Sequence, residues 1–375
     1  MINILHILKS TKRDKNIVSL YDSIEGINNS YLFDRNLVHQ KNSENDYHFL
    51  KQKENVSFYD NSKDIILTNI SFDYIFVYAL SAHQIRLCEK YKSSNTKIVW
   101  VSLGGELYSN LFMNVNDIYQ KETLVALKSL NLLRSTFREV FYKIIKTNSS
   151  ANRFLKNVDF VSPRLENEME IIKKNKKIAA PYIRLPLGDN IERSQEKINK
   201  IDSAASEVYV GPSAAPSSNH LDVFKKIFDL KLNTKVNVTL SYKIKKDYQE
   251  YIIKKGYEYF GDNFTPQTSF YSKNEFDAML NNCKIAIFNN ERQEGLLTIA
   301  NCIEKGMKVF LSETSPSYKY LQKAGYNIFS FQNEFNYAIV NETNDDIKAN
   351  IDNDSIFFFD ERKAIRDALH KMEKL

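Results

Sequence analysis

The sequence EVYVGPSAAPSSNHLDVFKKIFDLKLNTKVNVTL, residues 207–240, places a helical pattern between two short apolar runs. Val208–Val210 and Val236–Leu240 are rich in valine, as strands are. His220–Leu230, between them, carries apolar residues at helical spacing. A strand, a helix and a second strand in this order predict one unit of a parallel sheet.

The same alternation continues towards the C-terminus. Gly306 and Gly325 follow predicted helices at positions that need a left-handed cap. The expected elements are helix 247–255, strand 257–260, helix 273–281, strand 284–288, helix 296–305, strand 307–311, helix 317–323 and strand 326–329. This pattern predicts a doubly wound α/β domain.

The first half of the chain follows a similar plan with longer insertions. The expected elements are strands 3–8, 31–33, 74–79, 98–102 and 160–162 and a helix at 83–91. A polar stretch at 187–205 separates the halves, so we predict domains at 1–195 and 196–375. We expect two Rossmann-like domains facing a cleft. A C-terminal helix at 360–375, with Asp360 as its N-cap, is assigned to the second domain, although its apolar stripe would also suit the first.

The composition excludes several classes of protein. The 375 residues suffice for two domains, and the three cysteines form no CxxC pair, so neither a disulfide framework nor a structural zinc site is expected. No apolar run reaches the 18 residues of a membrane span, so we expect a cytoplasmic protein. Because GxGxxG and GxxxxGK[ST] are both missing, a nicotinamide dehydrogenase or a P-loop enzyme is disfavoured.

Two loops at predicted strand ends carry residues suited to phosphate. In Gly211–His220 the small residues allow close approach to a ligand, and Ser213 and Ser217 supply hydroxyl donors. An ordinary capped turn fits this loop equally well, and His220 alone favours a capping or surface role. In Asn289–Gly295, Arg292 can pair with a diphosphate and Gly295 opens the start of a helix. A charged, solvated loop is the alternative there.

A third motif, Trp100–Tyr108, holds the only tryptophan and the only Gly-Gly pair. Glu106 follows this turn at a strand end, where a carboxylate can accept the proton of an attacking hydroxyl. An exposed capping acid is the plain alternative.

The sequence pattern of residues 124–146 predicts a basic amphipathic helix, with Arg134, Arg138 and Lys143 among its charges. Residues 1–190 hold 27 Lys and Arg against 20 Asp and Glu, a net charge of +7. Such a helix can lie in a membrane interface or pack its apolar face inward, and the sequence leaves both open.

Together these segments resemble the 4-acetamido-4,6-dideoxygalactose (Fuc4NAc) transferase family. These bacterial enzymes move Fuc4NAc from a dTDP-sugar onto the lipid-linked intermediate of enterobacterial common antigen. Near Trp100 the family pattern reads WGAD, whereas this chain has a glutamate at 106. The matching residues are His6, Ile7, Leu8 and Ser10; Trp100, Gly104, Glu106, Leu107 and Tyr108; Val210, Gly211, Ser213, Ser217 and His220; Phe276, Asp277, Ala278, Leu280 and Cys283; and Arg292, Gln293, Gly295, Thr298 and Gly306.

The resemblance implies a GT-B glycosyltransferase that needs no metal and no further cofactor. It implies a dTDP-sugar, or a UDP-sugar, in the second domain and a polyprenyl-diphosphate-linked glycan acceptor against the first. We therefore expect a peripheral protein on the anionic inner-membrane surface, with no nucleic-acid partner. The expected donor-binding residues are Gly211, Ser213, Ser217, His220, Tyr242, Arg292, Gln293, Glu294, Gly295 and Thr298.

For catalysis we expect Glu106 as the base, with His83 and His6 as alternatives. A GT-B-type nucleotide-sugar 2-epimerase and a non-catalytic nucleotide- or glycan-binding scaffold are the competing functions. The basic helix favours the transferase over the epimerase, and Arg292 with Gly295 argues against a scaffold.

Overall fold

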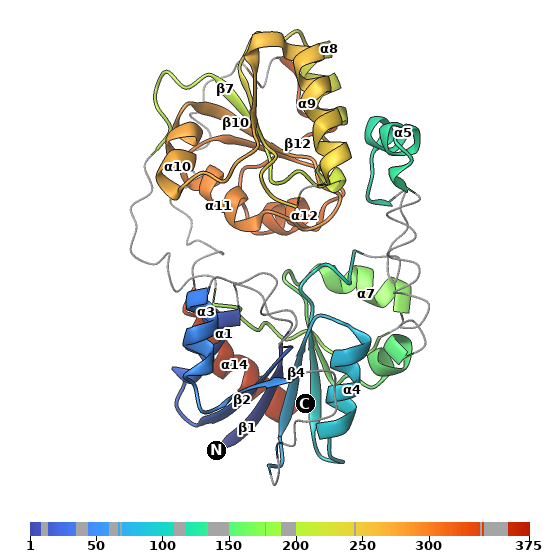
Figure 1. The fold of residues 1–375 in the computed structure, drawn as a ribbon, viewed down its shortest axis with the longest axis vertical. Coiled ribbons are helices and arrows are strands. Elements are labelled where there is room, and N and C mark those ends of the chain that lie inside the picture. Colours follow the sequence, from blue (N-terminus) through green and yellow to red (C-terminus); the bar gives the residue numbers. More distant parts are fainter. Residues whose placement is uncertain are drawn as a thin grey trace. The chain divides into compact units, whose positions relative to one another are not determined.

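The chain forms two α/β units in a computed structural model (Figure 1). Unit 1 comprises Met1–Phe112, Val140–Gln195 and Phe358–Leu375, and unit 2 comprises Met113–Glu139 and Glu196–Phe357. The structure describes residues 1–8, 14–34, 44–59, 67, 70–108, 117–133, 150–176, 178–188, 200–243, 245–337, 340 and 359–375.

Unit 1 contains a parallel sheet in the order β3-β2-β1-β4-β5-β6. The order reverses between β1 and β4, the point where such sheets bind ligands beyond the carboxyl ends of their strands. The strands are β1 Ile2–Ile7, β2 Ile27–Asp34, β3 Val56–Tyr59, β4 Tyr74–Tyr78, β5 Lys97–Val101 and β6 Phe160–Ser162. The helices include α1 Asp14–Asp22, α3 Glu44–Lys51, α4 Ala82–Tyr91, α7 Glu168–Lys176 and α14 Glu361–Lys374.

Unit 2 repeats this plan with the order β12-β11-β10-β7-β8-β9, and its reversal lies between β7 and β10. All neighbouring strands are parallel. The strands are β7 Glu207–Val210, β8 Val236–Thr239, β9 Phe264–Gln267, β10 Cys283–Phe288, β11 Lys308–Leu311 and β12 Phe329–Ser330. The helices are α5 Lys121–Ser129, α8 His220–Asp229, α9 Lys246–Phe260, α10 Lys273–Asn281, α11 Leu296–Glu304 and α12 Pro316–Lys323.

Local sequence explains where several of these helices begin and end. Ser272 and Glu275 form a reciprocal capping box at α10. Asp360 caps α14 as predicted, accepting a hydrogen bond from Lys363 N at 3.0 Å. The predicted caps at Gly306 and Gly325 are also confirmed, because both have a φ of +83°.

The predicted strand at 257–260 is wrong, since these residues form the last turn of α9. Their alternating aromatics resemble a strand pattern, but the rings pack around helix neighbours instead. Tyr259 meets Phe228 with ring centroids 5.3 Å apart, and Phe260 meets Phe224 at 5.4 Å. The strand of this region is β9, which begins four residues later at Phe264.

Two helices belong to a different unit from the one that the predicted domain ranges assign them to. Helix α14, predicted with residues 196–375, belongs to unit 1, where Ile365 and Leu369 join its core beside α1 (Figure 1). Helix α5, predicted with residues 1–195, belongs to unit 2 and contacts α8. Apolar contacts between distant segments decide both placements, and no local pattern records them.

The amphipathic helix predicted at 124–146 is therefore only partly described. The prediction of one continuous helix is wrong within the described residues, because α5 ends at Ser129 and Asn131 has a left-handed φ of +54°. Ala126 and Leu127 are buried in the core of unit 2. The apolar face of this part packs inward. Arg134, Arg138 and Lys143 lie outside the described residues.

Candidate functional site

The loops that follow β7, β8 and β10 meet at the reversal point of the second sheet. The loop after β7 is bonded to the loop after β8, because Ala214 N donates to the carbonyl of Tyr242 at 2.8 Å. It also packs on the start of α11. A Cβ added at Gly295, which has a φ of +70°, would lie 2.6 Å from the Cβ of Pro212. Glycine is thus required both by the backbone and by this close approach.

Glu294 lies at the centre of these loops, and its side chain is only 7% exposed. We call Glu294 and the five side chains that donate to it the Glu294 cluster. The donors to Oε1 are Lys243 Nζ at 2.6 Å and Ser213 Oγ at 3.2 Å. The donors to Oε2 are Arg292 Nη2 at 2.7 Å, Arg292 Nε at 2.9 Å, Asn290 Nδ2 at 3.2 Å and Ser217 Oγ at 3.3 Å.

The electrostatics of this cluster keep Glu294 ionised. Burial alone would raise the pKa of Glu294, but the charges and hydrogen bonds of Arg292 and Lys243 outweigh it and lower the pKa to about 2. One carboxylate therefore faces two cations, and the cluster carries a net positive charge. The start of α11 adds the positive end of its helix dipole. This arrangement suits an anionic ligand.

The structure thus brings together Ser213, Ser217, Arg292, Glu294 and Gly295 of the predicted donor-binding set. The other members lie around them. Tyr242 is 52% exposed beside Lys243, Gly211 follows β7, and Thr298 is in the first turn of α11. Gln293 is partly exposed on the same loop.

His220 differs from the expected ligand contact. Its ring is fully buried at the start of α8, and this burial lowers its pKa to about 4. Its Nδ1 lies 3.5 Å from the hydroxyl of Tyr248. His220 is therefore a neutral residue of the protein core.

Sequence reasoning missed a contribution from the segment that contains α5. Gln120 exchanges two hydrogen bonds with the amide of Asn289, at 2.7 and 2.9 Å, and donates to Glu291 at 2.5 Å. Asp222 of α8 accepts from the backbone N–H groups of Glu122 and Thr123 at 2.8 and 3.0 Å, and so caps α5. About 100 residues or more separate these partners along the chain, so no spacing rule could reveal them.

Unit 1 places two carboxyl groups near the carboxyl ends of β5 and β6. Glu106 is partly exposed in a turn, and its Oε1 accepts a hydrogen bond from Leu103 N at 3.0 Å. Glu168, which was not predicted, is buried at the start of α7 and accepts hydrogen bonds from the Tyr108 hydroxyl and Leu165 N. Burial raises the pKa of Glu168 to about 7, and the nearby charge of Glu106 adds to this.

The two histidine alternatives have different surroundings. His83 is partly exposed at the start of α4, stacked on Tyr59 with centroids 4.7 Å apart. His6 is fully buried, bonded to Tyr78 and Asn29 at 3.0 Å each, and burial lowers its pKa to about 4. Since a base must reach the acceptor hydroxyl, this burial argues against His6 in that role.

Among the described residues, no three His, Cys, Asp or Glu side chains form a metal-binding group, and metal independence stays a prediction. None of the described helices is long and apolar enough to cross a membrane.

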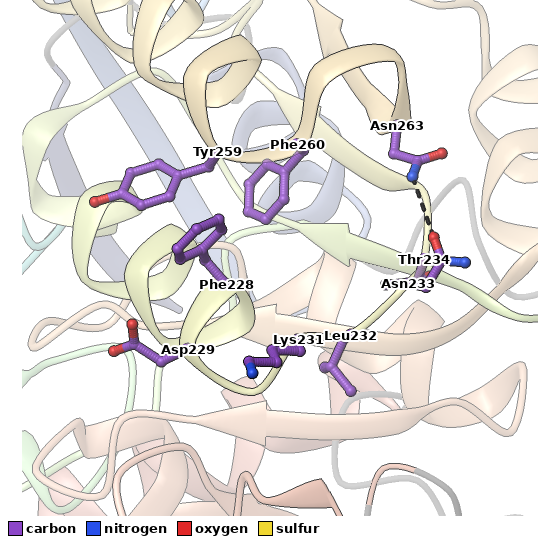
Figure 2. Close-up of a pocket in the computed structure, with 9 residues that line it drawn as sticks. All are labelled: Phe228, Asp229, Lys231, Leu232, Asn233, Thr234, Tyr259, Phe260 and Asn263. Atoms are coloured by element: carbon purple, nitrogen blue, oxygen red, sulfur yellow. Dashed lines mark hydrogen bonds between the residues drawn. The ribbon is translucent and has the colours of Figure 1, made fainter.

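A pocket of about 500 Å³ lies at the amino ends of strands in the second sheet, beside the residues where β8 and β9 begin. Figure 2 shows Phe228, Tyr259 and Phe260 on one side of it and the hydrogen bond from Asn263 to Asn233 on the other. Because the strands are parallel, this pocket is separate from the Glu294 cluster at their carboxyl ends.

The family model for glycosyl transferase group 56, described as 4-alpha-L-fucosyltransferase, matches residues 166–373. This match covers more than half of the chain and includes the whole of the Glu294 cluster. The chain belongs to glycosyl transferase group 56. No curated protein matches it.

Solved structures resemble this group 56 protein over its full length. HepE of Anabaena, solved with UDP and glucose, is 11% identical with a TM-score of 0.59, and 100% of each chain is covered. The lipopolysaccharide outer core galactosyltransferase WaaB is 13% identical with a TM-score of 0.60, again over 100% of each chain. A glycosyltransferase from Rickettsia africae is 10% identical with a TM-score of 0.54, over 100% of this chain and 98% of its own. The predicted GT-B fold is confirmed, and the protein is a glycosyltransferase.

Proposed function

We propose that this protein transfers an acetamido-dideoxyhexose of the Fuc4NAc type from a dTDP-sugar, or a UDP-sugar, to a lipid-linked glycan. The observation that carries the donor half is the Glu294 cluster beside the start of α11. It provides a guanidinium, an ammonium and two hydroxyls at the reversal point of the sheet. These are the groups that bind phosphate oxygens and stabilise a departing diphosphate.

The sequence resemblance supports the sugar and the acceptor of this proposal. The description of group 56 names a fucosyl transfer, which agrees with a 6-deoxyhexose donor. HepE was solved with UDP and glucose, which agrees with a nucleotide-sugar in this fold. The net charge of +7 on residues 1–190 favours an acceptor held at an anionic membrane surface.

We also propose that the transfer needs no metal ion. Arg292, Lys243 and the dipole of α11 supply positive charge where a diphosphate leaving group would develop its negative charge. Activity should therefore persist in EDTA, and loss of activity that Mg²⁺ or Mn²⁺ restores would contradict this.

The test of donor binding is calorimetry with dTDP and UDP. Arg292→Ala removes a charged hydrogen-bond donor, so the binding free energy should weaken by about 1.5 to 3 kcal/mol. Arg164→Ala, a substitution in unit 1, is the control and should bind like the parent. Unchanged affinity in Arg292→Ala would remove this loop from the donor site.

A further inference from the structure

The Glu294 cluster contains more hydrogen-bond donors than one carboxylate has acceptor sites. Six hydrogen bonds reach its two oxygens, which offer about four lone-pair sites. Three of the six come from cationic nitrogen atoms. The cluster therefore has donor capacity for more negative charge than Glu294 brings.

A diphosphate matches this surplus, because it offers several oxygens and at least two negative charges to the same kinds of donor. It would meet a carboxylate already bonded to both cations. Two anions in contact repel each other, and the repulsion is strongest where the site is shielded from water. Glu294, with a 7% exposed side chain, lies in such a place.

We propose that Glu294 is a resident anion of the donor site, whose carboxylate holds the hydrogen bonds of Lys243 and Arg292 that the diphosphate takes over. Lys243 is then the second cation of the diphosphate site. This inference rests on the proposed function, namely that a nucleotide diphosphate binds at the start of α11.

The conformation of Lys243 supports its part in this exchange. Its φ of +55° lies in the left-handed region, which is costly for a residue with a side chain and is often retained at functional sites. Its side chain is 42% exposed, against 20% for Arg292. Lys243 can therefore turn from Glu294 towards an incoming anion without leaving the surface.

The proposal and a purely structural ion pair predict opposite changes in diphosphate affinity when Glu294 is neutralised. If Glu294 only braces Arg292 and Lys243, its neutralisation loosens both cations and weakens diphosphate binding. If Glu294 competes with the diphosphate, its neutralisation releases both cations and strengthens binding.

The experiment is calorimetric titration of the full chain with UDP, dTDP and inorganic pyrophosphate. Glu294→Gln keeps the shape and one acceptor oxygen, and it should bind all three about three- to tenfold more tightly. Glu291→Gln is the matched control. It removes the same charge from the same loop, but the Glu291 carboxylate accepts from the neutral groups of Gln120, Ser312 and Thr314. Its affinities should stay within about twofold of the parent.

A second variant keeps the test decisive if Glu294→Gln does not fold. Lys243→Met should weaken binding of all three probes about tenfold, as expected for one charged hydrogen bond. Lys246→Met removes a charge three residues away, where the side chain is 83% exposed, and should have no effect.

The proposal is overturned if folded Glu294→Gln binds the probes no more tightly than the parent, if Glu291→Gln gains as much, or if Lys243→Met binds normally. If the parent protein binds none of the three probes, the proposed function itself fails, and these outcomes separate the two.

Discussion

Glu106 and Glu168 are connected through one turn of unit 1. Glu106 holds the start of the turn by its bond from Leu103 N, and Tyr108 at the other end donates to Glu168. The carboxylate of Glu106 is partly exposed and is suited to proton transfer. The buried carboxylate of Glu168 fixes the turn that carries Glu106. Strand-end position and chemistry predicted Glu106, whereas Glu168 looked like any acid at a helix start.

Glu106→Gln should lower turnover by about 10² to 10⁴, the usual loss for a general base, because the amide cannot accept the acceptor's proton. Donor affinity and melting temperature should stay near those of the parent. Glu166→Gln, an exposed acid in the same unit, should keep full turnover. If Glu106→Gln keeps more than about a tenth of its activity while His83→Ala loses it, the base is His83. If both variants survive, a retaining mechanism without a protein base is favoured.

Glu168 should make the stability of unit 1 depend on pH. Its pKa rises from 4.5 to about 7 on folding, so the folded state binds the proton more tightly. The free energy of unfolding should then fall by about 3 kcal/mol as the pH rises from below 4.5 through 7. Trp100, the only tryptophan, is buried in β5 and reports this unfolding by fluorescence. Glu168→Gln should flatten the profile between pH 5 and 7.5, and an unchanged slope would contradict the assignment.

At the scale of elements, local period and turn chemistry predict most of unit 2. The strands near 208, 236, 284 and 308 and the helices between them need only neighbours in sequence to be recognised. The loop positions of Arg292 and Ser213 follow from them. Lys243 was missed because β8 ends without a glycine or a phosphate motif. The α9 turn at 257–260 was misread because its aromatics pack on α8 and β9, and periodicity does not report tertiary packing.

The membrane prediction rests on Arg134, Arg138 and Lys143, which come after the end of α5 and lie outside the described residues. Charge reversal at Arg134, Arg138 and Lys143 should abolish binding to anionic liposomes without changing the melting temperature. Binding of the parent should decline with salt, because exposed charges are screened within about 8 Å at physiological ionic strength. Reversal at Lys225, an exposed position of α8 in unit 2, is the control. Flotation that is insensitive to both salt and these substitutions would remove the membrane surface from the proposed partners.

At the scale of the whole molecule, the placement of α5 and α14 determines which unit a substitution in these helices destabilises. Leu369 is buried in the core of unit 1 although it lies near the end of the sequence. Leu369→Ala should therefore cost about 2 to 5 kcal/mol and shift the Trp100 fluorescence transition to lower denaturant. His370→Ala, at the exposed neighbouring position, should leave it in place. A Trp100 transition that does not move in Leu369→Ala would show that α14 does not stabilise unit 1.

The position of α14 in the sequence also determines when the core of unit 1 can be completed during synthesis on the ribosome. Strand β1 of unit 1 is synthesised before any part of unit 2, yet the core of unit 1 includes a helix that follows the whole of unit 2 in the chain. At about 5 to 20 residues per second, the intervening segment takes on the order of ten to thirty seconds to make. During that interval Ile17, Val18 and their neighbours lack the apolar face of α14. Until α14 is synthesised, the nascent chain therefore exposes part of the apolar core of unit 1.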